Sequence, residues 1–261
     1  MAVTRLVAPA KLTVSLRVVG RRPDGYHDLV AEMVSVDLAD DLAIDPDGDG
    51  LVVTSADGRP LRGLGEGRDN LVRRALAAVG RRAGVRLTKR IPVGGGLGGG
   101  SADAAAVLRW AGCTDPAVAA SLGADVPFCV AGGRAEVSGI GDRVVPLDFE
   151  PRAFVLLVPP FGVDTAAAYA AFDALGPGLG EGENDLTAAA LAVAPELASW
   201  RDRFAEVTGR RPVLAGSGST WFVEGTPDAL GLSGRESLSL GGGEVGRLVA
   251  VRTVPAGWAG G

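Results

Sequence analysis

Hydrophobic and polar residues alternate along much of the first 60 positions of this chain. The alternation is clearest over 12–20 and 33–46, and a shorter run follows over 51–58. Alternation with a period of two is the pattern of a strand that buries one face, and sequences rich in Gly, Pro and Asp separate the runs. The chain is therefore predicted to begin with a series of β-hairpins.

The spacing of the apolar residues changes to that of a helix over 70–84, where they recur every three or four positions. Asp69 stands directly before this run and is predicted to cap the helix. A strand over 85–93 then runs into the glycine-rich segment 94–100, and that segment runs into an alanine-rich helix over 101–112. This part of the chain therefore has the order helix, strand, loop, helix.

A further hairpin is predicted over 134–147, and the pattern of strands and helices starts again after it. An apolar strand over 154–160 precedes an alanine-rich helix over 165–175, and further strands and helices follow. Separate groups of strands and helices of this kind are typical of α+β folds. We therefore predict an α+β protein with two domains, residues 1–150 and 151–261.

Composition narrows the possible classes of protein. The 261 residues are 47% hydrophobic and 22% charged, which is enough apolar material for a folded core. A net charge of -5 offers no basic surface to a phosphate backbone, so nucleic acid is not an expected partner. No apolar run approaches the roughly 18 residues of a membrane span, so no membrane association is expected.

Several residue types that carry chemistry are scarce in this chain. Only Lys11 and Lys89 among the 26 basic residues are lysines, and His27 is the single histidine. Cys113 and Cys129 form no CxxC motif and have no histidine cluster near them, which argues against both a zinc site and a disulfide framework. A reducing cytoplasm is therefore the expected location.

The segment 94–100 consists of six glycines and one leucine, and Ser101 follows it. Such a backbone can turn its N–H groups toward one point, where the positive end of the next helix adds its field. This arrangement predicts a cradle for a phosphate, and a flexible linker is the alternative. The Walker pattern GxxxxGK[ST] is absent, and a formal GxGxxG match follows a charged, proline-broken segment rather than a buried strand.

Three further features could serve a site for phosphoryl transfer. Lys11 lies inside an alternating strand, where a lysine is either a solvated edge residue or a cation that meets a phosphoryl group. Asp125 stands among apolar neighbours and is either a turn residue or a base that receives a hydroxyl proton. The segment 215–222, AGSGSTWF, is either a tight turn or a second anion-binding nest.

These pieces, in this order, resemble one known family. The segments PAKLTVSLRVVGRRPDGYHDL, KRIPVGGGLGGGSADAAAVL, LGADVPFCVAGG and AGSGSTWF are similar to the motifs of the 4-diphosphocytidyl-2-C-methyl-D-erythritol kinases, a family within the GHMP kinase superfamily. The two small-residue loops alone indicate the superfamily, whereas GRRPDGYH beside PAKL indicates the family. The resemblance extends from about residue 7 to residue 225.

The resemblance implies a fold and a reaction. The fold is α+β, the two-lobed GHMP kinase fold, with a ribosomal S5 domain 2-like N-terminal domain, a ferredoxin-like C-terminal domain and the active site between them. ATP is the implied co-substrate and Mg2+ the expected metal ion. The γ-phosphoryl group would pass to the 2-hydroxyl of a small-molecule substrate, the cytidine diphosphate derivative of methylerythritol, in non-mevalonate isoprenoid biosynthesis.

The resemblance also implies roles for individual residues. Lys11 and Asp125 match the family's catalytic residues, and Asp125 would be the base. The cytosine would lie between two tyrosines with a histidine at its edge, and Thr13 stands where the family usually has Asn. The implied substrate-binding residues are Thr13, Tyr26, His27 and Tyr169. The implied nucleotide-binding residues are Asn70, Lys89, Pro92, Val93, Gly94, Gly95, Gly96, Leu97, Gly98, Gly99, Gly100, Ser101 and Ala102.

Three other functions remain as alternatives at the level of sequence. The nearest is a GHMP-type kinase for another small alcohol, and the motif GRRPDGYH argues against it. A non-catalytic nucleotide-binding protein is the second, because the stretch between Ala106 and Gly123 is shorter than in most members of the family. A dinucleotide-dependent oxidoreductase is the most distant, since only the formal GxGxxG match supports it.

Overall fold

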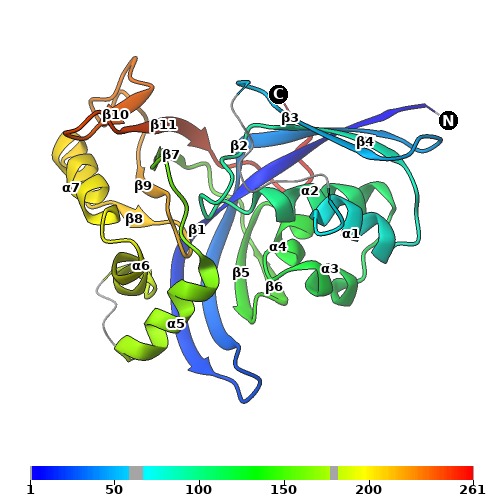
Figure 1. Cartoon of the computed structure of the whole chain (residues 1–261), viewed down its shortest axis with the longest axis horizontal. Coiled ribbons are helices and arrows are strands. Elements are labelled where there is room, and N and C mark those ends of the chain that lie inside the picture. The colour runs from blue at the N-terminus through cyan, green and yellow to red at the C-terminus, as the bar shows by residue number, and fades with distance from the viewer. Residues whose placement is uncertain (1, 59–66, 177–181, 261) are drawn as a thin grey trace.

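Two long antiparallel strands, β1 (Thr4–Arg21) and β2 (His27–Asp45), form a hairpin that runs through the middle of the molecule (Figure 1). The computed structural model describes residues 2–58, 67–176 and 182–260. Both strands extend well beyond the alternating runs of the sequence. The pairing register shifts at three places along β1, the first of them between Pro9 and Ala10. Each irregularity interrupts the alternation of buried and exposed side chains, so the pattern understates the length of the strands.

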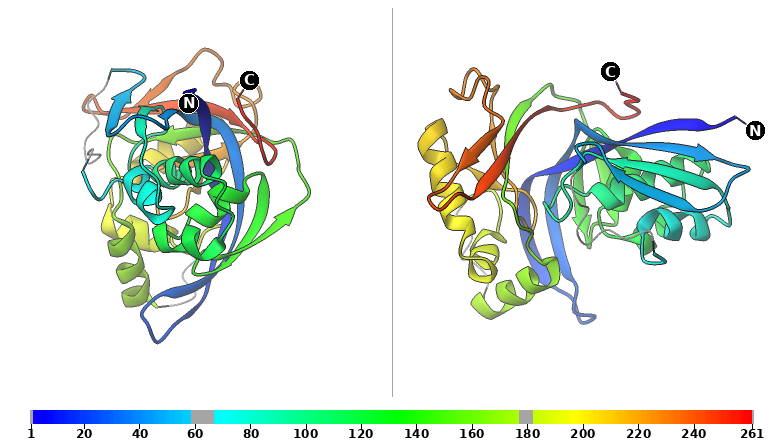
Figure 2. Two further views of the ribbon diagram at one scale, coloured as in Figure 1. Left: turned by 90° about the vertical axis from the view of Figure 1, so that its right-hand side faces the viewer. Right: turned by 45° about the horizontal axis from the view of Figure 1, so that its top comes forward.

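The first sheet contains this hairpin and carries its helices on one face (Figure 2). Among the described residues its strand order is β3-β4-β2-β5-β6, with β1 paired to β2 and only β3 and β4 parallel. Helix α2 packs against both strands of the hairpin and is buried over most of its length. The other elements of this lobe are β3 (Leu51–Ser55), α1 (Leu71–Ala78), β4 (Gly84–Lys89), α2 (Gly99–Trp110), α3 (Pro116–Leu122), α4 (Val126–Ala131), β5 (Arg134–Gly139) and β6 (Arg143–Leu147).

The second sheet is antiparallel throughout the described residues, in the order β10-β11-β7-β9-β8. Its core contains Trp200 and Phe204 from α7 and Trp221 from β9. Helix α5 lies beside the lower arm of the hairpin (Figure 1). The elements of this lobe are β7 (Ala153–Val158), α5 (Thr165–Leu175), α6 (Thr187–Val193), α7 (Leu197–Thr208), β8 (Val213–Leu214), β9 (Trp221–Glu224), β10 (Ser237–Ser239) and β11 (Val245–Arg252).

The N-terminal cap of α1 is Asn70, so the prediction of Asp69 as the cap was wrong. The side-chain oxygen of Asn70 accepts a hydrogen bond from the backbone N–H of Val72 at 2.9 Å. The helix begins at Leu71, and the capping oxygen has to come from the residue directly before it to reach the second helical N–H. Asn70, the polar residue directly before the apolar pattern, would therefore have been the better prediction of the cap.

Helix α2 begins at Gly99, two residues before the pattern indicated. Gly98 precedes it in a left-handed conformation with φ of 66°, and Gly99 and Gly100 then adopt helical geometry. The last glycines of the loop thus form the first turn of the helix, with Ser101 inside it. The predicted helix over 165–175 and the predicted hairpin over 134–147 are confirmed.

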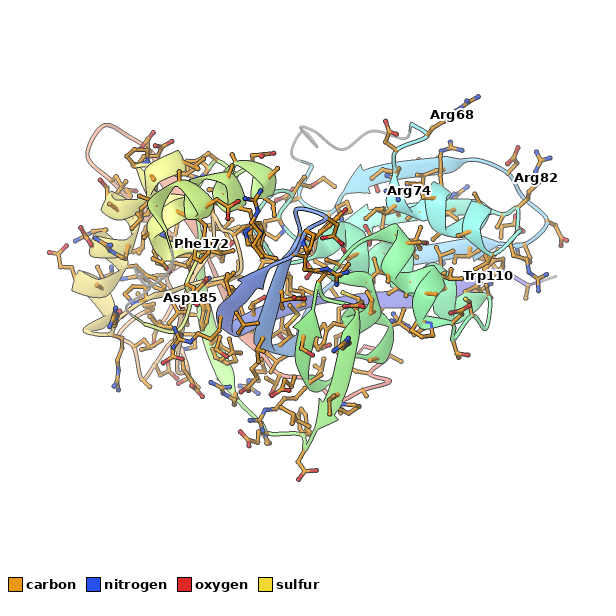
Figure 3. The ribbon with its side chains drawn as sticks, turned by 90° about the horizontal axis from the view of Figure 1, so that it is seen from below. Arg68, Arg74, Arg82, Trp110, Phe172 and Asp185 are labelled. Carbon is orange, nitrogen blue, oxygen red and sulfur yellow. The ribbon has the colours of Figure 1, made fainter. Side chains whose placement is uncertain are left out.

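Contacts between the two lobes are made on both sides of the hairpin. Asp185 pairs with Arg17 at 2.8 Å and accepts a hydrogen bond from the backbone N–H of Val18 at 3.0 Å (Figure 3). Farther along the hairpin, the backbone N–H of Val254 donates to the carbonyl oxygen of Ser35 at 2.9 Å. The chain after β11 therefore returns to the first sheet.

One core cluster includes side chains from both sheets, among them Phe154 and Phe222 of the second sheet. The strands of the first sheet all precede residue 150, and those of the second sheet all follow it. The division into residues 1–150 and 151–261 stays a prediction, because the lobes share this core.

The sequence argued against a disulfide framework and against a membrane-spanning segment. Cys113 and Cys129 are both free thiols, and Cys129 is buried. Within the described ranges, none of the helices has the length and apolar character needed to cross a membrane.

Candidate active site

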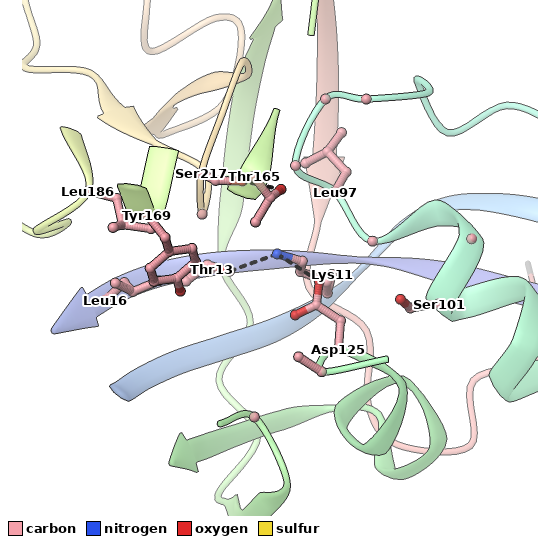
Figure 4. Close-up of a pocket in the computed structure, with 18 of the residues that line it drawn as sticks. Lys11, Thr13, Leu16, Leu97, Ser101, Asp125, Thr165, Tyr169, Leu186 and Ser217 are labelled. Carbon is pink, nitrogen blue, oxygen red and sulfur yellow. Dashed lines mark hydrogen bonds and ion pairs between the residues drawn. The ribbon is translucent and has the colours of Figure 1, made fainter. Parts of the chain in front are cut away.

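A cavity of about 880 Å³ lies between the two lobes (Figure 4). The hairpin, the glycine-rich loop, the residues before α4, helix α5 and the loop before β9 all contribute to its walls. The predicted site residues that line it are Lys11, Thr13, Tyr26, His27, Lys89, Pro92, Val93, Gly94, Gly95, Gly96, Leu97, Gly98, Gly99, Gly100, Ser101, Asp125 and Tyr169. The fold therefore brings most of the predicted site together.

Asn70 and Ala102 are the two predicted site residues that do not line this cavity. Asn70 uses its side-chain oxygen to cap α1, and Leu71 beside it borders the cavity instead. Ala102 is buried in α2, and its backbone N–H is bonded to the carbonyl oxygen of Gly98 at 2.8 Å. Both residues have structural roles at the starts of helices that carry lining residues.

Lys11 and Asp125 form an ion pair at the centre of the cavity. The Nζ atom of Lys11 lies 3.4 Å from Oδ2 of Asp125 and donates a hydrogen bond to the hydroxyl oxygen of Thr13 at 3.1 Å. Lys11 is buried on β1, which excludes the alternative of a solvated edge lysine. Asp125 precedes α4, but its side chain makes no capping bond, so the carboxylate faces the cavity and not its own helix.

Positive φ angles recur in the glycine-rich loop, at Gly94, Gly96 and Gly98. A Cβ atom on Gly98 would lie 2.7 Å from Cγ of Lys11. One on Gly96 would meet the carbonyl oxygen of Ala215 and lie 2.8 Å from that of Gly218. Only glycine combines these backbone angles with so close an approach of neighbouring chain. The loop is thus packed closely against its neighbours, which argues against the alternative of a flexible linker.

The second small-residue loop, residues 215–220, packs directly against the glycine-rich loop. The backbone N–H of Thr220 donates to the carbonyl oxygen of Gly95 at 3.3 Å, and the hydroxyls of Ser217 and Thr165 are 2.9 Å apart. Gly216 and Ser217 both line the cavity. The second loop therefore supports the first one and also forms part of the cavity wall.

The sequence pattern gave no indication of the role of Asn184. Its buried side-chain amide donates to the carbonyl oxygens of Leu214 at 2.8 Å and Gly216 at 2.6 Å. Its oxygen accepts a hydrogen bond from the backbone N–H of Leu186 at 2.9 Å. Asn184 therefore holds the second loop in place. Its position directly after a glycine-rich stretch resembles an ordinary turn, so no local signal distinguishes it.

Lys89 is the centre of a buried cluster of charges. Its Nζ atom is bonded to Asp40 and lies 2.7 Å from Oδ2 of Asp103, and all three side chains are buried. Burial lowers the pKa of Lys89, but the charges of Asp103 and Asp40 outweigh this effect and raise it. Burial raises the pKa of Asp103 to about 7, and the charge of Asp40 adds to this effect while the charge of Lys89 opposes it. Because two carboxylates already contact Nζ of Lys89, this nitrogen is poorly placed to bind a phosphate.

We expect Lys89→Met to destabilise the protein by about 3 to 5 kcal/mol, because it leaves two carboxylates buried without their cation. Chemical denaturation followed by circular dichroism measures the change in the free energy of unfolding. Arg90→Gln is the matched control, since it removes an exposed ion pair with Asp41 and should cost less than about 1 kcal/mol. A stable Lys89→Met protein with a raised KM for ATP would instead support the nucleotide-binding role implied by the sequence.

An aromatic cluster forms the far wall of the cavity, where α5 meets the hairpin. The ring of His27 stacks on Tyr169 with a centroid distance of 4.9 Å and an interplanar angle of 24°. Phe172, visible beside the hairpin in Figure 3, meets the His27 ring edge-on at 6.0 Å. Tyr26 lines the same cavity from the tip of the hairpin and is 62% exposed. Burial raises the pKa of Tyr169 to about 12, so its hydroxyl stays protonated at neutral pH.

Several solved structures with this architecture are kinases of small molecules. The sequence profile "GHMP kinases N terminal domain" matches residues 70–133, which include the glycine-rich loop and Asp125. The crystal structure of a homoserine kinase from Cytophaga hutchinsonii has the same fold, with a TM-score of 0.63, 15% identity, and coverage of 98% of this chain and 96% of that one. The matched domain and the fold are those of the GHMP kinases.

More similar relatives narrow the class to one family. A 4-diphosphocytidyl-2-C-methyl-D-erythritol kinase from Paracoccus denitrificans is 39% identical, covering 84% of this chain and 85% of its own length. One from Thermus thermophilus is 37% identical, covering 92% and 98%. A crystal structure of a 4-(cytidine 5'-diphospho)-2C-methyl-D-erythritol kinase is 33% identical with a TM-score of 0.71, covering 99% and 100%. The chain belongs to the family of 4-diphosphocytidyl-2-C-methyl-D-erythritol kinases.

Proposed function

We propose that this chain transfers the γ-phosphoryl group of ATP to the 2-hydroxyl of 4-diphosphocytidyl-2-C-methyl-D-erythritol, in the cytoplasm, as a step of non-mevalonate isoprenoid biosynthesis. The observation that carries the proposal is the ion pair of Lys11 and Asp125, which faces the same cavity as the glycine-rich loop. Family membership supplies the reaction class, and the cavity offers separate regions for a triphosphate and for a flat base.

Asp125 is the proposed base. Its carboxylate is partly exposed to the cavity and held at one end by Lys11, so the other end can accept the proton of a substrate hydroxyl. Lys11 then stabilises negative charge on the attacking oxygen and on the transferring phosphoryl group. The hydrogen bond from Lys11 to Thr13 fixes the direction of the ammonium group. Thr13 therefore acts on the reaction through Lys11.

The glycine-rich loop is the proposed phosphate site. Its backbone N–H groups and the start of α2 offer hydrogen-bond donors and a positive dipole end to the triphosphate. Lys11 is the cation that the cavity provides beside this loop, since Lys89 is held by two carboxylates. Lys11 would therefore serve both the triphosphate and the attacking oxygen of the acceptor alcohol.

Mg2+ is the proposed metal ion. In sites of this kind it is held by few protein oxygens, by substrate phosphates and by water. No group of three or more His, Cys, Asp and Glu side chains suited to a metal occurs in the part of the chain that the structure describes, and none is needed. Ser101, whose hydroxyl lines the cavity beside the loop, would hold the ion together with the phosphates of ATP. When bound, Mg2+ neutralises charge on the triphosphate.

The aromatic cluster is the proposed site for cytosine. A centroid distance of 4.9 Å exceeds the contact distance of about 3.5 to 4.0 Å between stacked carbons, so the rings of His27 and Tyr169 are not in full face-to-face contact. We propose that the rings are offset, which leaves part of the tyrosine face uncovered. A base in the plane of His27 would stack on the rest of that face, and Tyr26 would cover it from the hairpin. The position of cytosine between the two tyrosines stays a prediction.

The direct test is a kinase assay followed by phosphorus NMR. Purified protein, ATP, Mg2+ and the cytidine substrate are expected to give ADP and a new phosphomonoester signal, and omission of the substrate should abolish both. Homoserine and mevalonate serve as rival alcohols in parallel reactions. Phosphorylation of a rival but not of the cytidine compound would contradict the proposal, and ATP binding without any turnover would favour a non-catalytic protein.

We expect Tyr169→Ala to raise the KM for the cytidine substrate by about 5- to 150-fold, which corresponds to the loss of one stacking surface. Steady-state kinetics at saturating ATP measure this change, and kcat should change much less. Tyr169→Phe is the control, because it keeps the ring and removes only the hydroxyl. An unchanged KM in the alanine variant would mean that cytosine lies elsewhere.

A further inference from the structure

Asp173 connects helix α5 to the histidine of the hairpin. Its Oδ1 atom lies 2.6 Å from Nε2 of His27, and its Oδ2 atom lies 3.4 Å from the guanidinium of Arg21. The His27 side chain is buried and that of Asp173 is partly exposed, and both residues line the cavity. No local pattern indicates a role for Asp173, because 146 residues separate it from His27.

This contact determines which nitrogen of His27 carries its proton. An ionised carboxylate can only accept a hydrogen bond, so at 2.6 Å the proton between the two groups belongs to Nε2. In a neutral imidazole the other nitrogen, Nδ1, then has a free lone pair. Over residues 2–58, 67–176 and 182–260, no group donates a hydrogen bond to Nδ1. The Nδ1 atom is also not among the fully buried polar atoms that lack a partner.

A hydrogen-bond acceptor at the edge of a base pocket distinguishes the two pyrimidines. Cytosine carries an amino group on C4, which donates hydrogen bonds, whereas uracil carries a carbonyl oxygen there, which only accepts them. A base in the plane of His27, stacked on the uncovered part of Tyr169, would present this edge to the histidine. The lone pair of Nδ1 matches the amino group of cytosine and opposes the carbonyl oxygen of uracil.

We propose that Asp173 is a positioning residue that holds His27 with its proton on Nε2, so that Nδ1 selects a cytosine nucleotide over a uracil nucleotide. This inference rests on the proposed function for the identity of the base. The role of Asp173 is indirect, because it acts through His27. The side chain of its second partner, Arg21, is 62% exposed, so the ion pair with the other carboxylate oxygen is a weak surface contact.

NMR of the parental protein tests the proton position directly. His27 is the only histidine in the chain, so histidine labelled with 15N gives one pair of ring signals, and both signals belong to His27. For the neutral ring we expect a proton on Nε2 and none on Nδ1. A proton on Nδ1, alone or together with one on Nε2, would overturn the proposal without any variant being made.

Nucleotide binding tests the selection. Titration calorimetry with cytidine diphosphate and uridine diphosphate is expected to show a preference for the cytidine compound that falls by about tenfold in Asp173→Leu, the effect of one hydrogen bond. In the same variant the Nε2 proton signal should disappear through exchange with water. Parental preference together with a retained Nε2 proton in Asp173→Leu would overturn the proposal.

Arg21→Gln is the matched control, because it removes the other partner of Asp173 and leaves the contact with His27. It should keep the parental preference for cytidine diphosphate. Thermal unfolding shows whether Asp173→Leu is folded, and Asp173→Asn, with an amide oxygen that can still accept from Nε2, is expected to retain more of the preference. Calorimetry with the two diphosphates does not depend on phosphoryl transfer, so failure of the kinase assay and failure of this inference are distinguishable.

Discussion

Replacing Asp125 by Asn is expected to lower kcat by about 10²- to 10⁴-fold, the usual contribution of a general base, while the Kd for ATP stays within a few-fold. The amide has the same shape as the carboxylate but cannot take the hydroxyl proton. The change also removes the ion pair with Lys11, whose Nζ atom lies 3.4 Å from the carboxylate in the parental protein. Lys11 keeps its hydrogen bond to Thr13. Stopped assays give kcat, and calorimetry gives the affinity for ATP.

Asp164→Asn is the matched control for this change. Asp164 caps α5 by accepting a hydrogen bond from the backbone N–H of Ala167 at 2.7 Å, and an amide oxygen can still accept it. The same chemical change at this position should leave kcat within a few-fold of the parental value. If Asp125→Asn keeps kcat within tenfold, Asp125 is not the base, and its contact with Lys11 is only structural.

Replacing Lys11 by Arg should also lower kcat by about 10²-fold or more, although the charge is kept. The lysine side chain passes between two glycines: a Cβ atom on Gly98 would lie 2.7 Å from its Cγ, and one on Gly216 would lie 3.3 Å from its Nζ. A planar guanidinium is wider than an ammonium group and cannot take its place in this passage. A well-placed donor to developing negative charge is worth about 10²- to 10³-fold in rate.

Arg17→Lys is the control for Lys11→Arg, because it exchanges the same two residue types on the same strand. Arg17 is partly exposed, where it pairs with Asp185, so we expect its replacement to leave kcat unchanged. Thermal unfolding of both variants separates a loss of turnover from a loss of fold. Near-parental turnover of Lys11→Arg would contradict a direct role of the ammonium group in phosphoryl transfer.

Local patterns predicted the elements of the fold where those elements are regular. The helix over 165–175 has a capping aspartate and an uninterrupted alanine-rich pattern, and its bounds agree with the structure. The hairpin strands were predicted too short, because three register shifts interrupt their alternation. The cap of α1 was assigned to Asp69 instead of Asn70, since two adjacent residues of similar capping ability cannot be separated by pattern.

The candidate site was predicted in part. The residues that were missed all act through side-chain contacts with residues that are not adjacent to them in the sequence. The glycine-rich loop is a continuous signal, and the family motifs identify Lys11 and Asp125 beside it. The partners of Lys89 were not predicted, although Asp103 is only 14 residues away, because an aspartate in an alanine-rich helix looks like a surface residue. Asp173 acquires its role from a contact with the other lobe, and Asn184 from contacts with a loop about 30 residues away in its own lobe.

The sequence by itself determined the α+β class and the family, because these depend on the order and spacing of residues along the chain. Only the tertiary structure decided that Lys89 is paired inside the core, that Asn70 and Ala102 do not line the cavity, and that Asp173 holds His27. The physical reason is that charge pairing and the proton position of a histidine depend on distances of a few ångströms between side chains. Those distances are set by how the sheets, helices and loops pack, and spacing along the chain does not contain them.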